Sequence, residues 1–382
     1  MFFLDSKGHI WLASPHMSDE GFEQEFVQEA FDTNWIAPLG KNVNEFEKEM
    51  AHKLGAKNSV ALSAGTAAIH LGLKSAGVKE GDIVFCQSLT FSASANPITY
   101  LNAKPVFIDS DFESWCMSPE ALERAFEKYP ECKYVVVVHL YGLCAKLDEI
   151  MRICREHGAT LIEDAAESLG SKYKGKYTGT FGKCGIISFN GNKIITTSGG
   201  GMLLLNDDDA DELAQKVTFW STQSREKARH YQHKEIGYNY RMSNVVAGIG
   251  RGQLKVLDKR VEKKQYIYNF YKSHLSDLDG ISFMPTYDWE ESNCWLTCIQ
   301  LSGKVRPIDI LEGLEKCDIE SRPIWKPMHM QPVFADCDYI DNGAVAQHIF
   351  ENGVCLPSDT KMTDEDLIRV CTAIREIWNS KN

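Results

Sequence analysis

Several signals that define common protein classes are missing from this chain of 382 residues. Its net charge of −12 leaves no basic stripe that would neutralise phosphates, so we expect no binding to nucleic acid. It has no run of about 18 uncharged apolar residues, the length that crosses a bilayer, so no membrane partner is expected. Met1 to Lys7 lack a basic stretch followed by a sustained apolar run, which predicts no signal peptide and a cytoplasmic protein.

Paired cysteines are also missing, although the chain contains 12 cysteines. No Cys-x-x-Cys pair occurs, and the nearest neighbours, Cys294 and Cys298, fall on a predicted strand. Structural zinc sites cluster cysteine and histidine more tightly, so we expect no metal. Secreted disulfide proteins are shorter and denser in cysteine, which favours reduced thiols that pack as small apolar side chains.

Between about residues 55 and 210 the chain alternates short apolar runs with amphipathic segments. Strands are predicted at 59–62, 83–85, 105–108, 134–138, 160–162 and 186–189. Helices are predicted at 67–76, 119–129 and 147–157. This alternation, with strands that are apolar throughout, is typical of an α/β fold whose mainly parallel sheet carries helices on both faces. Ligands of such sheets bind beyond the carboxyl ends of the strands.

The pattern changes after about residue 240. Asn244 to Leu275 form one long, highly charged helical stretch, for which a solvated connecting helix is the simplest interpretation. The remainder mixes a strand at 295–301 with helices at 308–316 and 364–378. Because 382 residues are too many for one compact core, we expect a large domain at 1–240 and a smaller α+β domain at 241–382.

Three segments place polar residues at predicted strand ends. In the first, the strand at 160–162 runs directly into Glu163 and Asp164, and small residues follow before Glu167. An acid at a strand end also suits a helix N-cap or a metal ligand. A carboxylate that stays ionised at such a place can instead hold a protonated ring nitrogen.

In the second segment, Ser188-Phe189-Asn190-Gly191-Asn192-Lys193, a strand ends in a turn that presents one lysine. A surface lysine in a polar loop is the ordinary interpretation. Because this lysine follows a strand of the same sheet as Asp164, burial can deprotonate it near neutral pH, as a Schiff-base lysine requires. The glycines at 199–201 then allow backbone to pass close to a bulky ligand.

In the third segment, Ser63-Ala64-Gly65-Thr66-Ala67-Ala68, small residues join a strand to a helix. Free amides at the helix N-terminus and the Thr66 hydroxyl can bind a phosphate, although a simple helix cap gives the same pattern. The segment matches neither Gly-x-x-x-x-Gly-Lys-Ser/Thr nor Gly-x-Gly-x-x-Gly, which disfavours a mononucleotide-binding P-loop protein and a nicotinamide dehydrogenase. A phosphate site, a carboxylate and a lysine are thus predicted at one edge of the sheet.

In these segments the sequence resembles the fold-type I (aspartate aminotransferase-like) enzymes that use pyridoxal 5′-phosphate (PLP), and specifically the DegT/DnrJ/EryC1/StrS sugar aminotransferases. The resemblance covers essentially the whole chain. Residues 34–40, 190–201 and 322–329 resemble the branch that aminates UDP-4-keto-6-deoxy-N-acetylglucosamine on the way to bacillosamine-type sugars.

The resemblance implies a ping-pong aminotransferase. Glutamate would give its amino group and leave as 2-oxoglutarate, and a nucleotide-linked keto-sugar would then receive the group. Lys193 would carry PLP as a Schiff base and move the proton in both halves of the reaction. Asp164 would pair with the pyridine nitrogen, which makes the ring an electron sink.

The resemblance also implies the other contacts of PLP. Gly65, Thr66 and Ser188 would hold its phosphate. Glu167 occupies a position where relatives often have Gln and would lie near the PLP hydroxyl. Phe91 would stack on the ring, with an ordinary core phenylalanine as the alternative.

A homodimer with shared active sites is a further implication. Asn239 would reach the phosphate of the partner's cofactor. Trp35, His230, Tyr231 and His329 would contact the sugar, although a polar surface loop explains His230 and Tyr231 nearly as well.

The sequence departs from the family pattern after the lysine. Many relatives continue with Thr-Gly-Glu-Gly-Gly, whereas this chain has Thr197-Ser198-Gly199-Gly200-Gly201 and lacks that carboxylate. Lys193 argues against the dehydratase branch, which has histidine in its place. The nucleotide (UDP, GDP or dTDP) and the aminated carbon (C3 or C4) stay open, as does a PLP-binding regulatory protein.

Overall fold

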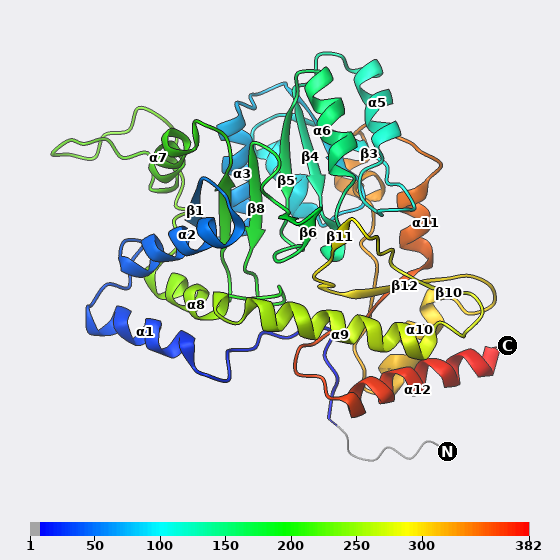
Figure 1. The fold of residues 1–382 in the computed structure, drawn as a ribbon. Coiled ribbons are helices and arrows are strands. Elements are labelled where there is room, and N and C mark those ends of the chain that lie inside the picture. Colours follow the sequence, from blue (N-terminus) through cyan, green and yellow to red (C-terminus); the bar gives the residue numbers. More distant parts are fainter. Residues whose placement is uncertain (1–7, 382) are drawn as a thin grey trace.

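A computed structural model describes residues 8–381 (Figure 1). Met1 to Lys7, the stretch used above to predict the absence of a signal peptide, lie outside the described residues. In the part of the chain that is described, no helix combines the length and the apolar character needed to cross a membrane.

The central element is an eight-stranded sheet with the strand order β1-β9-β8-β5-β4-β2-β3-β14. In that order the strands are Asn58–Leu62, Gly201–Leu205, Cys184–Ser188, Thr160–Asp164, Tyr134–Val138, Ile83–Gln87, Lys104–Ile108 and Tyr339–Ile340. Neighbouring strands from β8 to β14 are parallel, whereas β9 is antiparallel to both β1 and β8. The predicted mainly parallel α/β sheet is therefore confirmed, and β9 is an addition that the sequence pattern did not indicate.

Helices cover both faces of this sheet (Figure 1). One face packs against α3 (Gly65–Ala76), α4 (Asn96–Tyr100) and α7 (Ala210–Ser221), and the other against α2 (Lys41–Leu54), α5 (Pro119–Lys128) and α6 (Leu147–Glu156). Along β4, Val135 and Val137 belong to the apolar core between the sheet and α2, α5 and α6. Val136 belongs to the core between the sheet and α3, α4 and α7. Because side chains alternate along a strand, the apolar run of β4 supplies both cores at once.

The predicted single helix over Asn244 to Leu275 is wrong in detail, because the chain forms two helices. These are α8 (Asn244–Leu254) and α9 (Leu257–Leu275), which follow one another across the molecule in Figure 1. Nor is the stretch simply solvated, since Lys264 and Tyr271 in α9 are buried. Helix α8 packs closely on α1 (Phe22–Asp32), and a Cβ atom at Gly252 would lie 2.5 Å from the backbone nitrogen of Glu23.

The C-terminal region builds a second, antiparallel sheet with the order β10-β12-β15-β13. Its strands are Ile281–Phe283, Thr297–Leu301, Gly353–Leu356 and Arg322–Pro323; the remaining helices are α10 (Pro307–Lys316), α11 (Val345–Asn352) and α12 (Asp364–Lys381). A third core forms where this sheet packs against α9, α10 and α12. The domain boundary at residue 240 stays a prediction, and β14 crosses it by pairing with β3.

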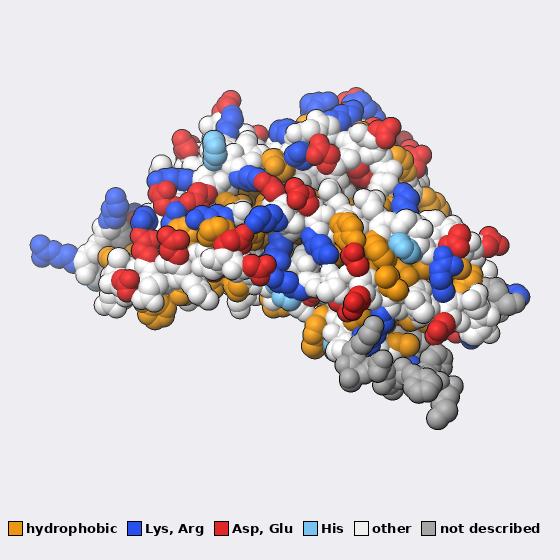
Figure 2. Space-filling model, turned by 60° about the horizontal axis from the view of Figure 1, so that its bottom comes forward, with side chains coloured by type: hydrophobic (Ala, Val, Ile, Leu, Met, Phe, Trp, Pro, Cys, Tyr) orange, Lys and Arg blue, Asp and Glu red, His pale blue; other side chains and the backbone are white. Residues whose placement is uncertain are grey.

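Short elements complete the fold. They are a three-stranded sheet of β11 (Glu290–Glu291), β6 (Lys172–Tyr173) and β7 (Lys176–Tyr177), and the single turns η1 (Ser92–Ser94), η2 (Leu140–Gly142), η3 (Met328–Met330) and η4 (Pro332–Phe334). All twelve cysteines are free thiols, and ten of them are buried. Acidic and basic side chains intermingle over the face drawn in Figure 2.

Candidate active site

The ends of the parallel strands meet at one cavity of about 280 Å³. Strand β5 ends at Asp164, β8 ends at Ser188, and α3 begins at Gly65 shortly after β1. Seven of the residues singled out in the sequence line this cavity: Gly65, Thr66, Phe91, Asp164, Glu167, Ser188 and Lys193. Residues separated by more than 120 positions in the chain are thus brought together where an α/β sheet normally binds its ligand.

The side chain of Lys193, in the turn that follows β8, is largely buried, with 12% of its surface exposed. Its Nζ atom lies 3.7 Å from Oε1 of Glu167 and 3.9 Å from the ring centroid of Trp295. Burial lowers the pKa of the ammonium group below its ordinary value, although the carboxylates of Glu167 and Asp164 act in the opposite direction. Lys193 is therefore the kind of lysine that can become a neutral nucleophile.

Asp164 is the last residue of β5 and is buried beside Lys193. Its Oδ2 atom accepts a hydrogen bond from Ser94 at 2.6 Å, and Oδ1 accepts one from the amide of Ala166 at 3.1 Å. Burial raises the pKa of the carboxyl group, while these two hydrogen bonds oppose that rise. A cationic ring nitrogen placed against Asp164 would favour its ionised form.

Glu167 is fixed by two N–H donors. Its Oε2 atom accepts from the backbone amide of Tyr141 at 2.8 Å, and Oε1 accepts from the indole Nε1 of Trp325 at 3.1 Å. Burial raises the pKa of this carboxyl group, and the nearby Lys193 acts against that rise. One oxygen of the side chain is held 3.7 Å from the lysine, so the charge of Glu167 acts on the pKa of Lys193 and favours its ammonium form.

The opposite end of the cavity is suited to an anion. The methyl side chain of Ala64, the N-cap residue of α3, cannot accept a hydrogen bond from the first amides of the helix. Gly201 of β9 lies so close that a Cβ atom there would be 2.4 Å from the carbonyl carbon of Ala64. Glycine is required for this approach, which places the helix N-terminus beside Ser188.

Phe91 is half-exposed and lies at the mouth of the cavity. Its ring is 5.3 Å from that of Trp325, at an interplanar angle of 53°. An exposed fraction of 50% is inconsistent with an ordinary core phenylalanine. The ring is free to contact a planar ligand.

These residues fit PLP. The cofactor carries a phosphate, a basic ring nitrogen and an aldehyde, and the cavity offers a helix N-terminus, a buried carboxylate and a largely buried amine for these three groups. The roles of the individual residues toward each group stay predictions.

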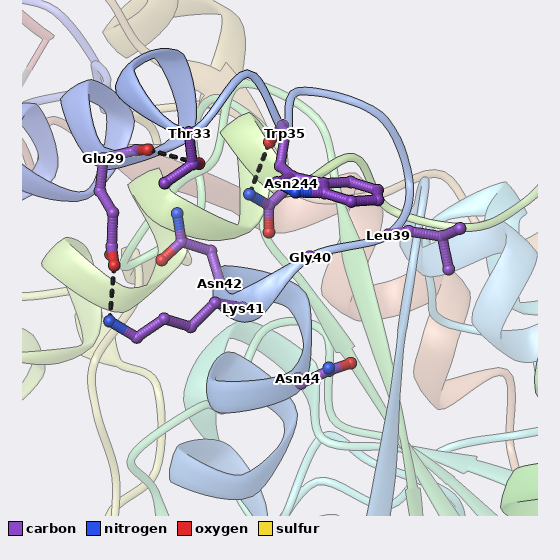
Figure 3. A pocket seen from close by; sticks show the side chains of 9 residues that line it. All are labelled: Glu29, Thr33, Trp35, Leu39, Gly40, Lys41, Asn42, Asn44 and Asn244. Atoms are coloured by element: carbon purple, nitrogen blue, oxygen red, sulfur yellow. Dashed lines mark hydrogen bonds and ion pairs between the residues drawn. The ribbon is translucent and has the colours of Figure 1, made fainter.

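Trp35 lies away from this cavity, in a second one of about 420 Å³ between α1, α2 and α8 (Figure 3). Trp35 is 54% exposed, and its backbone carbonyl accepts a hydrogen bond from Asn244 at 2.7 Å. Leu39 and Gly40 line the same cavity. Within one described chain, Trp35 and Lys193 therefore belong to different sites.

The remaining predicted residues also lie outside the lining of the Lys193 cavity as described in a single chain. His230 and Tyr231 lie on the loop after α7 that projects from the molecule in Figure 1, and Tyr231 is 78% exposed. Asn239 is exposed and accepts a hydrogen bond from Gln223 at 2.9 Å. His329 is stacked on Tyr339 and hydrogen-bonded to Ser88 at 2.7 Å.

Three cavity residues were missed by sequence reasoning. Ser94 binds Asp164, Trp295 lies against Lys193, and Trp325 binds Glu167. Trp325 falls inside the 322–329 stretch that carried the family resemblance, so a signal existed for it. Trp295 and Ser94 reach the site only through tertiary packing, which no local pattern indicates.

The fold and the cavity together define a PLP-dependent enzyme of fold-type I. The chain belongs to the DegT/DnrJ/EryC1/StrS aminotransferase family, which matches residues 17–375. Its cofactor is PLP.

Two relatives illustrate the family. EpsN of Bacillus subtilis (strain 168), which is named as a pyridoxal phosphate-dependent aminotransferase, is 52% identical over 97% of this chain and 96% of its own length. GDP-perosamine synthase of Caulobacter vibrioides is 35% identical over 96% of this chain and 98% of its own length.

Solved structures share the same fold. The PLP form of Spr1654 from Streptococcus pneumoniae, named as a sugar aminotransferase, superimposes with a TM-score of 0.91 at 23% identity, over 98% of this chain and 100% of that one. The aminotransferase TlmJ from Streptoalloteichus hindustanus gives a TM-score of 0.89 at 27% identity, over 97% of this chain and 99% of that one. The chain is thus an aminotransferase of this family, and it shares the fold of these solved enzymes.

Proposed function

We propose that this aminotransferase moves the amino group of glutamate to C4 of a nucleotide-linked 4-keto-6-deoxy sugar, with UDP-4-keto-6-deoxy-N-acetylglucosamine as the acceptor. The observation that carries the proposal is the largely buried amine of Lys193, which lies 3.7 Å from Glu167 in a cavity that Asp164 also lines. GDP-linked sugars are a second candidate, because a relative at 35% identity is named GDP-perosamine synthase.

In the proposed reaction PLP, when bound, supplies an electron sink that makes the α-hydrogen of the amino acid acidic. Gly65, Thr66 and Ser188 hold its phosphate, and Asp164 keeps its ring nitrogen protonated. The Nζ atom of Lys193 takes the proton from the donor and delivers a proton to the carbon of the acceptor. Because one cavity serves both substrates in turn, initial rates at several donor concentrations are expected to give parallel double-reciprocal lines.

The acceptor is tested with glutamate and a panel of UDP-, GDP- and dTDP-linked 4-keto and 3-keto sugars. The proposal expects the highest kcat/KM with the UDP-linked 4-keto sugar and no turnover by Lys193→Ala. Preference for a GDP-linked sugar would select the second candidate. Turnover by Lys193→Ala would refute the assigned role of the lysine.

We further propose a cytoplasmic homodimer in which Asn239, His230 and Tyr231 of one subunit reach the site of the other. The exposure of all three side chains in the single chain supports this arrangement. Large apolar side chains such as Trp35 and Leu39 are also exposed, and such surfaces commonly mark interfaces.

Mixing two inactive variants tests the shared site. A hybrid dimer of Lys193→Ala and Asn239→Ala subunits contains one site with both residues intact only if Asn239 acts across the interface. Activity is then expected to return on mixing and subunit exchange. If Asn239 acted within its own subunit, every site of the hybrid would stay impaired and the mixture would gain nothing.

A further inference from the structure

Trp295 makes two contacts with the turn that carries Lys193. The Nζ atom of Lys193 lies 3.9 Å above the centroid of its ring, and its indole Nε1 donates a 2.8 Å hydrogen bond to the carbonyl of Asn192. Trp295 precedes β12 in the C-terminal region and is almost completely buried. One side chain therefore meets both the amine of the lysine and the peptide that positions it.

The backbone of Trp295 is fixed from two directions. Its N–H donates to Oδ1 of Asn293 at 2.8 Å, and the side-chain amide of Asn293 donates to the carbonyl of Glu167 at 3.1 Å. Its carbonyl accepts from Nζ of Lys264 at 2.9 Å, and Lys264 also donates to the carbonyl of Ser358. Lys264 is a buried lysine that the proposed reaction does not use, and these bonds give it a structural task.

Trp295 is also one end of an aromatic brace, defined by Trp295, Tyr141 and Trp325. The ring of Tyr141 is stacked between the two indoles, with centroid distances of 6.1 Å to Trp295 and 6.0 Å to Trp325. Tyr141 adopts a φ of +54°, an uncommon conformation for a bulky residue, and its amide donates to Glu167. The brace thus ends at Lys193 on one side and at Glu167 on the other.

We infer that Trp295 is a positioning residue for Lys193: its ring face holds the protonated amine, and its indole N–H fixes the turn that presents the lysine. The face of an indole attracts an ammonium group, most strongly where water is excluded. The inference rests on the role proposed for Lys193.

The charged groups around the lysine are few. Glu167 and Asp164 act on Lys193 from the side of the main cavity. Lys193 also borders another, very small cavity, separate from the one around Trp35, whose other titratable lining residues are His16, Arg260 and Lys264. The last two are cations, so neither can replace the attraction of the Trp295 ring for the ammonium group.

Competitive labelling of the apoenzyme with acetic anhydride tests the inference, because only the neutral amine reacts. The labelling rate of the Lys193 peptide is measured against pH for the wild type, Trp295→Leu and Trp295→Phe. Loss of the ring is expected to lower the pH midpoint of Trp295→Leu by about one unit, and Trp295→Phe should fall between it and the wild type. Trp289→Leu, which removes a half-buried indole stacked on Tyr287, is the matched control with an unchanged midpoint.

The outcomes separate this inference from the proposed function. A folded Trp295→Leu apoenzyme with the wild-type midpoint would overturn the positioning role. If Trp295→Leu did not fold, the Trp295→Phe midpoint decides, and a value equal to that of the wild type overturns it equally. Failure of every keto-sugar to react would refute the proposed function. It would not change the labelling midpoints, which test Trp295 alone.

Discussion

Nζ of Lys193 lies 3.7 Å from Oε1 of Glu167, inside the cavity at the carboxyl ends of β5 and β8. Because little of either side chain is exposed, the pKa of the lysine is lowered and the pKa of the glutamic acid is raised. Burial thus brings each group closer to its uncharged form. A neutral amine can accept a proton, so burial favours the form of Lys193 that acts as a base, while the charge of Glu167 favours the ammonium form.

Replacing Glu167 tests that relationship. Glu167→Gln removes a negative charge that favours the ammonium form of Lys193, so the pH midpoint of Lys193 labelling in the apoenzyme should fall by about one unit. An amide offers one acceptor oxygen where the carboxylate offers two, so either Tyr141 or Trp325 also loses its acceptor. A midpoint that does not move would show that the carboxylate has no influence on the lysine.

Asp164 is expected to matter for chemistry rather than for folding. Asp164→Asn keeps one oxygen for the amide of Ala166, and its NH2 group can donate to the Ser94 hydroxyl, which can accept as well as donate. The asparagine cannot keep a ring nitrogen protonated. We expect kcat/KM to fall at least about 100-fold, equivalent to about 2.7 kcal/mol, with a small change in melting temperature. Steady-state kinetics and thermal unfolding measure the two effects, and full activity of the Asp164→Asn variant would remove the proposed role.

The neighbouring Glu163 provides the matched control. It points away from the cavity and binds His139 at 3.0 Å and the backbone amides of Gly179, Phe181 and Gly182. Although burial opposes ionisation, these partners lower the pKa of the Glu163 carboxyl group. Glu163→Gln should therefore destabilise the protein by about 2–4 kcal/mol, since it disrupts a buried, charged network. Equal losses of stability in the Asp164 and Glu163 variants would contradict the assignment of Asp164 to the reaction and of Glu163 to stability.

Thr66 is predicted to bind the phosphate of PLP. Thr66→Val preserves the shape of the side chain and removes its hydroxyl, so the dissociation constant of PLP from the apoenzyme should rise about tenfold. Absorbance titration of the apoenzyme measures this constant. Thr99→Val, an exposed change in α4, should leave it unaltered, and identical constants for the two variants would place the phosphate elsewhere.

Glu290 makes stability depend on pH. Burial raises the pKa of its carboxyl group to about 7 from the ordinary 4.5. The folded protein therefore binds this proton more tightly than the unfolded chain does. The contribution of Glu290 to stability is fully present below about pH 4.5 and is lost as the pH rises through 7. Glu290→Gln should gain about 1–3 kcal/mol over the wild type at pH 8 and little at pH 5.

Thermal unfolding of the apoenzyme from pH 5 to pH 8 checks the Glu290 prediction. The substituted amide keeps an acceptor for the amide of Cys144, which Oε2 of Glu290 binds at 2.9 Å. Glu291→Gln is the control, because the adjacent Glu291 side chain is exposed and paired with Lys172. A gain by Glu290→Gln that is the same at every pH would exclude titration of this carboxyl group as its cause.

The sequence was sufficient for the parallel part of the sheet. Strands such as β4 are apolar on both faces, and the helices between them follow the 3.6-residue period, so the alternation was visible locally. The antiparallel strand β9 and the break between α8 and α9 were not visible. The first depends on pairing with distant β1 and β8, and the second occurs at Lys255 and Val256, which have no strong helix-breaking character.

The residues of the candidate site were likewise only partly predictable from the sequence. Lys193, Asp164 and Gly65 stand at strand or helix ends, where topology alone places them together. Trp295 comes from the C-terminal region, and only the packing of that region against the turn after β8 brings it to Lys193. Asn239 and Tyr231 are exposed in the single chain, so their predicted tasks depend on a second subunit.

Reduction of the holoenzyme with borohydride, followed by digestion and mass spectrometry, tests the central claim most directly. Two lysines with little exposed surface lie near the cavity, Lys193 within it and Lys264 on the far side of Trp295's backbone. The account predicts that a single peptide carries the pyridoxyl group, at Lys193, and that treating the enzyme with glutamate before reduction prevents the modification. A pyridoxyl group on Lys264, or modification that glutamate does not prevent, would contradict it.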